Sequence, residues 1–242
     1  MTLRRRFFVE QFDGASAVLR GDAAHHLGRV LRAEPGQLYE LSDGQAVWLA
    51  RTERVRRDAV DFSLVEPLPA RQPRLQATLL LAIVKFDRFE WSLEKATELG
   101  VAEIVPLAAA RSEKALVAAA AKRAGRWQKI LLESAQQARR VRRPVLHPAT
   151  RPATAFRMAG ARDAALLLLS ERAEAMLLRK HLEGKESTSA ALAIGPEGGW
   201  TGEEFAAARA AGFAEVSLGG NIPRTETAVV AALAMLNYAL GD

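Results

Sequence analysis

Residues 192–236, LAIGPEGGWTGEEFAAARAAGFAEVSLGGNIPRTETAVVAALAML, contain the pattern that decides the expected fold. The apolar run 190–194 is typical of a buried strand, and it ends in a turn with three glycines at 195–199. A second apolar run, 216–218, ends in Gly219-Gly220 and leads into a final helix at 228–240. Ligands of α/β sheets bind beyond the carboxyl ends of strands, so a site is expected at these two glycine turns.

A helix with a capping box is predicted between these two strands. Thr201 is a suitable N-cap, Glu204 follows three residues later, and Gly212 is suited to end the helix. Neither glycine turn has the Gly-Lys-Ser/Thr ending of a P-loop or the G-x-G-x-x-G spacing of dinucleotide-binding folds. The sequence therefore does not favour a phosphate-cradling nucleotide site. Tight turns in an ordinary α/β domain are the simpler alternative.

The region from residue 75 onward alternates apolar strands with amphipathic helices. Further strands are expected at 77–84, 103–107, 145–146 and 164–169. Helices are expected at 122–139, at about 173–182, and after Asp87, which can cap a helix. This alternation predicts an α/β fold with a largely parallel sheet.

Residues 1 to about 68 have the pattern of a small β-rich domain. Short strands are expected at 7–9, 38–41, 46–50, 53–55 and 60–65, and their spacing favours a small barrel. Asp22 is expected to cap a short helix whose residues Leu27, Val30 and Leu31 face inward. Three prolines at 67–73 indicate a stiff linker, because proline does not fit inside a helix or sheet. The predicted domains are therefore 1–70 and 71–242.

The composition of the 242 residues excludes several classes of protein. Hydrophobic residues make up 49%, enough for a core, but no apolar run reaches the roughly 18 residues of a membrane span. With no signal-peptide pattern at the N-terminus, a cytoplasmic protein without membrane association is expected. The absence of cysteine excludes disulfides and thiol catalysis. Of four histidines only His25 and His26 are close together, and adjacent side chains diverge, so no metal site is expected.

The charge of the chain favours a polyanionic partner, with nucleic acid as the first candidate. The net charge is +6, and 27 of the 34 basic residues are arginines, which bind phosphate through a planar fork. A general preference for arginine would explain this excess but not the clusters at 4–6, 54–57 and 139–143. The short helix would also place His26, Arg29 and Arg32 on one basic face, for which a solvated surface is the alternative.

The C-terminal motifs resemble those of a known enzyme family. Gly195-Pro196-Glu197-Gly198-Gly199, Leu218-Gly219 and Arg224-Thr225-Glu226-Thr227-Ala228 are similar to the signature of the bacterial 16S rRNA (uridine-N3)-methyltransferases, of the SPOUT superfamily. Segments 85–88, 95–100, 111–112 and 126–130 also resemble family segments, so the similarity covers most of the chain. The chain departs from the family pattern at Phe86, Ala138-Arg139-Arg140 and Pro223, where glycine, Ser-Gly-Arg and leucine are usual.

The resemblance implies a fold and an activity. It implies a SPOUT domain at 71–242, with a parallel sheet and a trefoil knot, and a PUA-like β-barrel RNA-binding domain at 1–70. It further implies a homodimer that uses S-adenosyl-L-methionine to methylate N3 of uridine in 16S rRNA of the assembled small ribosomal subunit. Ribose 2′-O-methylation, and RNA binding in ribosome assembly without catalysis, are the alternatives.

The resemblance also assigns site residues. Arg224 and Glu226 are the expected catalytic residues, because uracil N3 must lose a proton, either to a base such as Glu226 or Glu197 or with help from positive charge. A structural ion pair for Glu226, or a base from the other subunit, are the alternatives. The cofactor pocket is assigned to Leu169, Ser170, Ile194, Gly195, Glu197, Gly199, Leu218, Gly219, Ile222, Thr225 and Ala228. The expected RNA contacts are Arg4, Arg5, Arg6, His26, Arg29, Arg32, Arg139, Arg140, Arg142 and Arg143.

Overall fold

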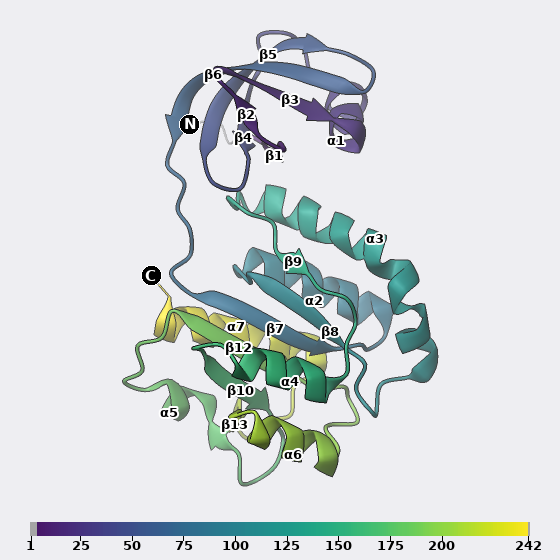
Figure 1. Cartoon of the computed structure of the whole chain (residues 1–242), viewed down its shortest axis with the longest axis vertical. Coiled ribbons are helices and arrows are strands. Elements are labelled where there is room, and N and C mark those ends of the chain that lie inside the picture. Colours follow the sequence, from purple (N-terminus) through teal and green to yellow (C-terminus); the bar gives the residue numbers. More distant parts are fainter. Residues whose placement is uncertain (1–3, 242) are drawn as a thin grey trace. The chain divides into compact units, whose positions relative to one another are not determined.

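The computed structural model describes residues 4–241, and its contacts divide the chain into two compact units (Figure 1). Unit 1 consists of the residues up to Gln72 together with Ala135–Arg143. Unit 2 consists of Pro73–Ser134 and the residues from Pro144 onward. Each unit has a sheet and a hydrophobic core of its own. Among residues 4–241, no helix is both long enough and apolar enough to cross a membrane.

Unit 1 is built on a six-stranded sheet with the order β1-β4-β5-β6-β3-β2. Neighbouring strands are antiparallel except β1 and β4, which are parallel. Alternate strand residues such as Leu19, Leu41 and Phe62 are buried in one core, because successive side chains point to opposite faces of a sheet. The strands are β1 (Arg6–Phe8), β2 (Phe12–Asp13), β3 (Ser16–Arg20), β4 (Leu38–Ser42), β5 (Val47–Val55) and β6 (Ala59–Leu68).

The short helix of unit 1 differs from its prediction. Helix α1 (Gly21–His25) has Arg20 at its N-cap, so the expected capping role of Asp22 is wrong. The helix continues as a π-helical turn, η1 (His26–Val30), in which the N–H of Leu31 donates to the carbonyl of His26. The wider π turn rotates Val30 away from the core, so that Val30 is 62% exposed, whereas Leu27 is fully buried.

The proline-rich linker begins later than predicted, because Pro67 is part of β6 and lies opposite Trp48 of β5. Strand β3 pairs with β6 only as far as Ser63. Beyond that point β6 has a neighbour on one side only, so the missing N–H of a proline can be tolerated there.

Unit 2 contains a seven-stranded sheet with the order β11-β13-β10-β12-β7-β8-β9, in which every neighbouring pair is parallel. This confirms the predicted α/β fold with a parallel sheet. The strands are β7 (Gln76–Ala82), β8 (Glu103–Leu107), β9 (Val145–Leu146), β10 (Ala165–Leu169), β11 (Met176–Leu177), β12 (Ser189–Ile194) and β13 (Ala214–Ser217). The helices are α2 (Phe86–Glu98), α3 (Lys114–Gln137), α4 (Pro152–Gly160), α5 (Leu178–Leu182), α6 (Gly202–Ala210) and α7 (Thr225–Leu240).

Helices cover both faces of this sheet (Figure 1). Leu79 and Leu81 of β7 pack in a core with apolar residues of α2, α3 and α7. Leu80 and Ala82, which alternate with them, pack in a second core with residues of α4 and α6. Both faces of the sheet are thus buried, which explains why its strands are almost continuously apolar.

Several helix boundaries in unit 2 also differ from prediction. Helix α2 has Lys85 at its N-cap, so Asp87 lies in the first turn and does not cap the helix. Helix α3 begins at Lys114 rather than 122, because the alanine-rich run that follows Lys114 is itself strongly helix-forming. The span 173–182 is not one helix, since its middle forms edge strand β11 beside β13 and only α5 is helical. Helix α4 was not predicted.

Candidate functional site

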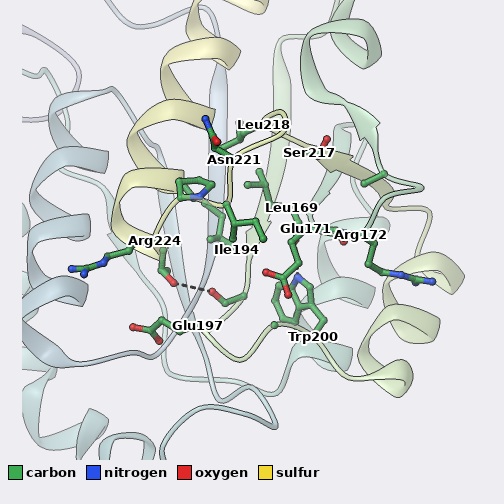
Figure 2. A pocket seen from close by; sticks show the side chains of 18 of the residues that line it. Leu169, Glu171, Arg172, Ile194, Glu197, Trp200, Ser217, Leu218, Asn221 and Arg224 are labelled. Carbon is green, nitrogen blue, oxygen red and sulfur yellow. Dashed lines mark hydrogen bonds between the residues drawn. The ribbon is translucent and has the colours of Figure 1, made fainter.

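A cavity of about 880 Å³ lies at the carboxyl ends of the adjacent strands β10, β12 and β13 of unit 2 (Figure 2). The segment after β10 contributes Ser170, Glu171 and Arg172, and the two glycine turns contribute most of the remaining wall. All eleven residues that the family resemblance assigned to a cofactor pocket line this one cavity: Leu169, Ser170, Ile194, Gly195, Glu197, Gly199, Leu218, Gly219, Ile222, Thr225 and Ala228.

The first glycine turn is held tightly against Trp200. A Cβ atom at Gly195 would lie 3.0 Å from the indole ring, so no larger residue fits there without displacing the tryptophan. The indole Nε1 in turn donates a hydrogen bond of 2.9 Å to the carbonyl oxygen of Leu169, at the end of β10. Gly199 has a φ of +71°, which favours glycine. The turn therefore has a fixed shape that joins two strand ends.

The helix after this turn confirms the predicted capping box. The hydroxyl of Thr201 accepts a hydrogen bond from the N–H of Glu204, and the Glu204 carboxylate accepts one from the N–H of Thr201. Glu204 is buried and also accepts a hydrogen bond of 2.8 Å from the N–H of Ala110. Gly212 follows the helix with a φ of +89°, in agreement with its predicted role.

The second glycine turn meets the first through Thr225. Arg224 is the N-cap residue of α7, and the hydroxyl of Thr225 donates to the carbonyl oxygen of Gly195, 3.3 Å away. Gly219 has a φ of +135°, and a Cβ atom there would meet no atom within 4 Å. The second turn therefore presents open backbone to the cavity while α7 anchors it.

Charged side chains missed by the sequence reasoning also line the cavity. The Nη1 of Arg111 donates to the carbonyl oxygen of Gly198, 2.6 Å away. The guanidinium of Arg172 stacks on the ring of Phe205 at 4.9 Å and lies 3.7 Å from the carboxylate of Glu215. Glu171 lines the cavity beside them (Figure 2). The only sequence signal for Arg111 was its place in a family-like segment, because it lies far from the glycine turns along the chain.

The two expected catalytic residues lie in different surroundings. Arg224 lines the cavity, but Glu226 does not. Glu226 lies 3.8 Å from Nε of Arg88, whose Nη1 is 3.0 Å from Oε1 of Glu197. The Oε2 atom of Glu226 is buried and has no hydrogen-bond partner among residues 4–241. The ion-pair partner of Glu226 is thus Arg88 and not its neighbour Arg224.

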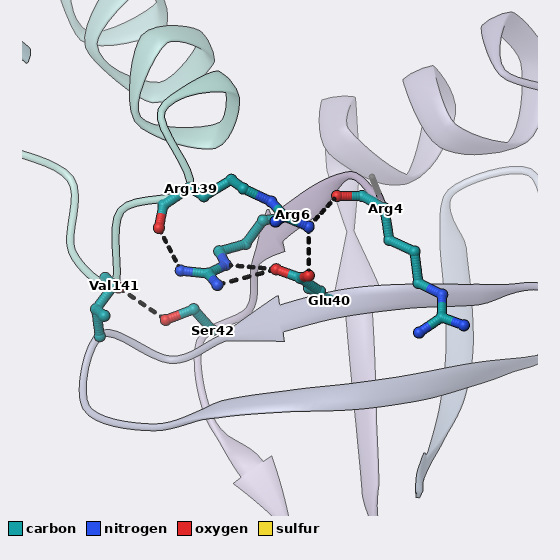
Figure 3. Close-up of polar contacts among 6 residues, drawn as sticks. All are labelled: Arg4, Arg6, Glu40, Ser42, Arg139 and Val141. Atoms are coloured by element: carbon teal, nitrogen blue, oxygen red, sulfur yellow. Dashed lines mark hydrogen bonds and ion pairs between the residues drawn. The ribbon is translucent and has the colours of Figure 1, made fainter. Parts of the chain in front are cut away.

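Two of the expected RNA-binding arginines are instead engaged inside unit 1 (Figure 3). Arg6 is buried, and its Nε and Nη2 donate to Oε2 of Glu40 at 3.1 and 2.9 Å. Arg139 donates to Oε1 of the same carboxylate at 2.5 Å, and Arg6 also donates to the carbonyl of Arg139. Arg6 is therefore not placed as an exposed phosphate ligand, because its guanidinium satisfies a buried carboxylate.

The backbone of this segment is unusual. Arg139 has a φ of +53°, in the left-handed region that favours glycine, and it stands where the family usually has the glycine of Ser-Gly-Arg. Burial lowers the pKa of Arg140 to about 10, which leaves it charged near neutral pH. The remaining expected RNA contacts are exposed: Arg4, Arg5, His26, Arg29, Arg32, Arg142 and Arg143.

Known proteins resemble this chain over nearly its whole length. The profile of the RNA methyltransferase domain family matches residues 71–237. Ribosomal RNA small subunit methyltransferase E of Synechocystis is 34% identical, over 96% of this chain and 76% of that protein. The protein of the same name from Mycobacterium bovis is 32% identical, over 94% and 88%.

Solved structures give the same answer. Ribosomal RNA small subunit methyltransferase E from Neisseria gonorrhoeae, bound to S-adenosyl methionine, has a TM-score of 0.88 to this chain, with 30% identity and 99% of both chains covered. A Legionella pneumophila protein in complex with the same cofactor has a TM-score of 0.86, with 31% identity and complete coverage. This chain therefore belongs to the RNA methyltransferase family.

Proposed function

We propose that this chain is an S-adenosylmethionine-dependent ribosomal RNA methyltransferase that modifies N3 of a uridine in 16S rRNA. The observation that carries the proposal is the cavity at the ends of β10, β12 and β13, with all eleven assigned cofactor residues in its wall. Similarity over 99% of the chain to a relative solved with S-adenosyl methionine supports the cofactor. The names of the relatives support ribosomal RNA of the small subunit as the substrate.

The cavity suits this cofactor in size and in chemistry. Its volume of about 880 Å³ lies within the range of small-molecule sites, about 300–1,000 Å³. Leu169 and Leu218 offer apolar walls to a neutral adenine ring, and the open backbone at Gly219 offers hydrogen-bonding groups without charge. Glu171 and Glu197 line the cavity together with Arg111, Arg172 and Arg224, and charges of both signs suit a ligand that carries a sulfonium, an ammonium and a carboxylate group.

The chemistry requires removal of a proton. When bound, S-adenosylmethionine supplies a methyl group on a cationic sulfur. This methyl group passes to uracil N3 as its bond to sulfur breaks. The N3 proton must go to an acceptor as the new nitrogen–carbon bond forms. We assign to Arg224, which lines the cavity, the role of lowering the pKa of the uracil imide through its positive charge.

Glu226 is our candidate for the proton acceptor. One oxygen of its carboxylate is buried without a partner among the described residues, which leaves it able to accept a proton from a ligand. Glu226 lies in the first turn of α7, where the positive end of the helix dipole attracts an anionic group. Since Glu226 lies outside the cavity wall, this role requires the target base to approach alongside the N-terminus of α7.

The exposed arginines of unit 1 are our candidates for RNA contacts. Phosphate contacts of this kind position an RNA without choosing the base, and the target uridine must be unpaired or flipped out to reach a pocket. We propose further that residues 1–70 form a PUA-like β-barrel RNA-binding domain and 71–242 a knotted SPOUT domain. A cytoplasmic homodimer acting on the assembled small ribosomal subunit completes the proposal.

Methyl transfer to isolated small ribosomal subunits that lack the modification tests this function. Radiolabelled S-adenosylmethionine is the donor, and the RNA is digested to nucleosides for chromatography. We expect labelled 3-methyluridine from the unaltered chain and strongly reduced label with Arg224→Ala. The variant Arg162→Ala is the matched control, because its ion pair with Glu103 lies at the amino end of β8. Label in a 2′-O-methylated nucleoside, or cofactor binding without transfer, would contradict the assignment of N3.

A further inference from the structure

Arg88 links the first glycine turn to the first turn of α7 from outside the cavity. It lies in the first turn of α2 and is not part of the cavity wall. Its guanidinium is 3.0 Å from Glu197, in the first glycine turn, and 3.8 Å from Glu226, in the first turn of α7. Helix α2 follows β7, which is the neighbour of β12, so Arg88 and the glycine turns occupy the same edge of the sheet. One cation thus connects the first turn of α2 with the segments that follow β12 and β13, at one edge of the sheet.

The second connection between these walls is inside the cavity, where Thr225 donates to the carbonyl of Gly195. The two contacts lie on different sides of the segment that enters α7, because Thr225 lines the cavity and Glu226 does not. A single hydrogen bond allows two walls to pivot about it, whereas a second contact at a distance from it prevents that motion. Arg88 therefore prevents a pivoting motion of the two walls that the hydrogen bond of Thr225 alone would allow.

The charges around Arg88 make its removal costly for both turns. The side chains of Arg88, Glu197 and Glu226 are 27%, 44% and 17% exposed, so water screens the contact with Glu226 less than the contact with Glu197. Without the guanidinium, two carboxylates that share one cation would remain close together and repel each other. They would also repel the phosphate backbone of an RNA substrate.

We propose that Arg88 is a positioning residue that sets the distance between the first glycine turn and the N-terminus of α7, and that it holds Glu226 with its Oε2 atom free for a donor. This inference rests on the proposed function, because it describes how the cofactor cavity and the proton acceptor are kept in register. Arg88 touches neither cofactor nor substrate in this assignment, and it acts through Glu197 and Glu226.

The test measures the dissociation constant of S-adenosylmethionine by calorimetry, for the full chain and its variants. We expect Arg88→Ala to raise this constant about tenfold, the size of one partly screened charge-assisted hydrogen bond. Arg88→Lys keeps the charge and is expected to recover part of the loss. The control Arg162→Ala removes an arginine from an ion pair of similar length, 2.9 Å, and is expected to bind the cofactor like the unaltered chain.

The background of Glu197→Gln separates positioning from a general loss of structure. There Arg88 has one carboxylate less to neutralise, so Arg88→Ala is expected to cost at most about threefold in affinity, whereas a purely structural role predicts the same loss in both backgrounds. An equal loss in both backgrounds, or no loss in either, would overturn the inference while leaving the proposed function intact. Failure of the unaltered chain to bind the cofactor would overturn both.

Discussion

The hydroxyl of Thr225 donates a hydrogen bond to the carbonyl oxygen of Gly195, and this bond joins two turns that follow different strands. Gly195 follows β12 directly, and Thr225 begins α7 after the turn that follows β13. Strand β10 separates β12 from β13 in the sheet, so the bond spans the end of a third strand. Both residues line the cavity, so the bond connects two of its walls.

Replacing Thr225 by valine tests the contribution of this bond. Valine has nearly the same shape but no hydrogen-bond donor. We therefore expect a loss of about 1 kcal/mol in the free energy of cofactor binding, which corresponds to an affinity about fivefold weaker. Thr225→Ser retains the hydroxyl and is the matched control. Calorimetric titration with S-adenosylmethionine gives both values, and equal affinity of the valine and serine variants would contradict the role of the bond.

The close contact between Gly195 and Trp200 predicts a strong effect of a single methyl group. In Gly195→Ala the new Cβ atom would lie 3.0 Å from the indole, so the ring must shift and its hydrogen bond to Leu169 must weaken. We expect a loss of stability of about 1–3 kcal/mol, typical of overpacking, together with a loss of cofactor binding. Gly202→Ala is the control, because a Cβ atom there meets nothing within 4 Å. A melting curve that is the same for both variants would refute this account.

The left-handed backbone of Arg139 predicts an inverted order of stability for two substitutions. Arg139→Ala and Arg139→Gly both remove the ion pair with Glu40, but only glycine adopts a φ of +53° without backbone strain. We therefore expect the glycine variant to be about 1 kcal/mol more stable than the alanine variant, opposite to their order in an exposed helix. Hydrogen exchange of the amides of β4 reports the local stability of unit 1 and can resolve this difference. A more stable alanine variant would argue against the left-handed conformation.

The ion pairs of Glu103 predict that the fold becomes less stable as the pH falls. Burial alone would raise the pKa of Glu103, but hydrogen bonds from Arg162 and His147 outweigh it and lower the pKa below its usual value of 4.5. A carboxyl group with a lowered pKa stabilises the fold above the pKa of the unfolded chain and loses that contribution as the pH falls through the folded value. Urea unfolding should thus show Glu103→Gln less stable than the unaltered chain near neutral pH. The difference in stability between the two proteins should narrow as the pH falls below 4.5, and a difference independent of pH would contradict the linkage.

Local patterns in the sequence predicted the strands of unit 2 well. The expected strands 103–107 and 145–146 coincide with β8 and β9, because a short apolar run between turn-forming residues is typical of a buried strand in an α/β chain. The capping box of Thr201 and Glu204 is equally local and is confirmed. Helix starts were less predictable, since a charged residue such as Asp87 fits both an N-cap and a first turn.

Features that depend on distant residues could not be predicted. Arg6 has the same local sequence as its exposed neighbours Arg4 and Arg5, and only the fold brings Glu40 and Arg139 to it. The residues of the site divide in the same way, into local motifs that could be predicted and distant residues that could not. Glycine turns were visible as motifs, but Arg88 and Arg111 reach them from segments far away in the chain, with no periodicity to mark them.

The discontinuity of unit 1 has a consequence for the order of events during synthesis. Its six strands leave the ribosome early, yet residues 135–143, which supply the second arginine for the carboxylate of Glu40, are translated only after β7, α2, β8 and most of α3. Until then the buried carboxylate has a single cationic partner, and the sheet lacks the segment that binds Ser42 through Val141. The N-terminal unit of the nascent chain therefore completes its fold only while the C-terminal unit is already emerging, which couples the maturation of the two units in time.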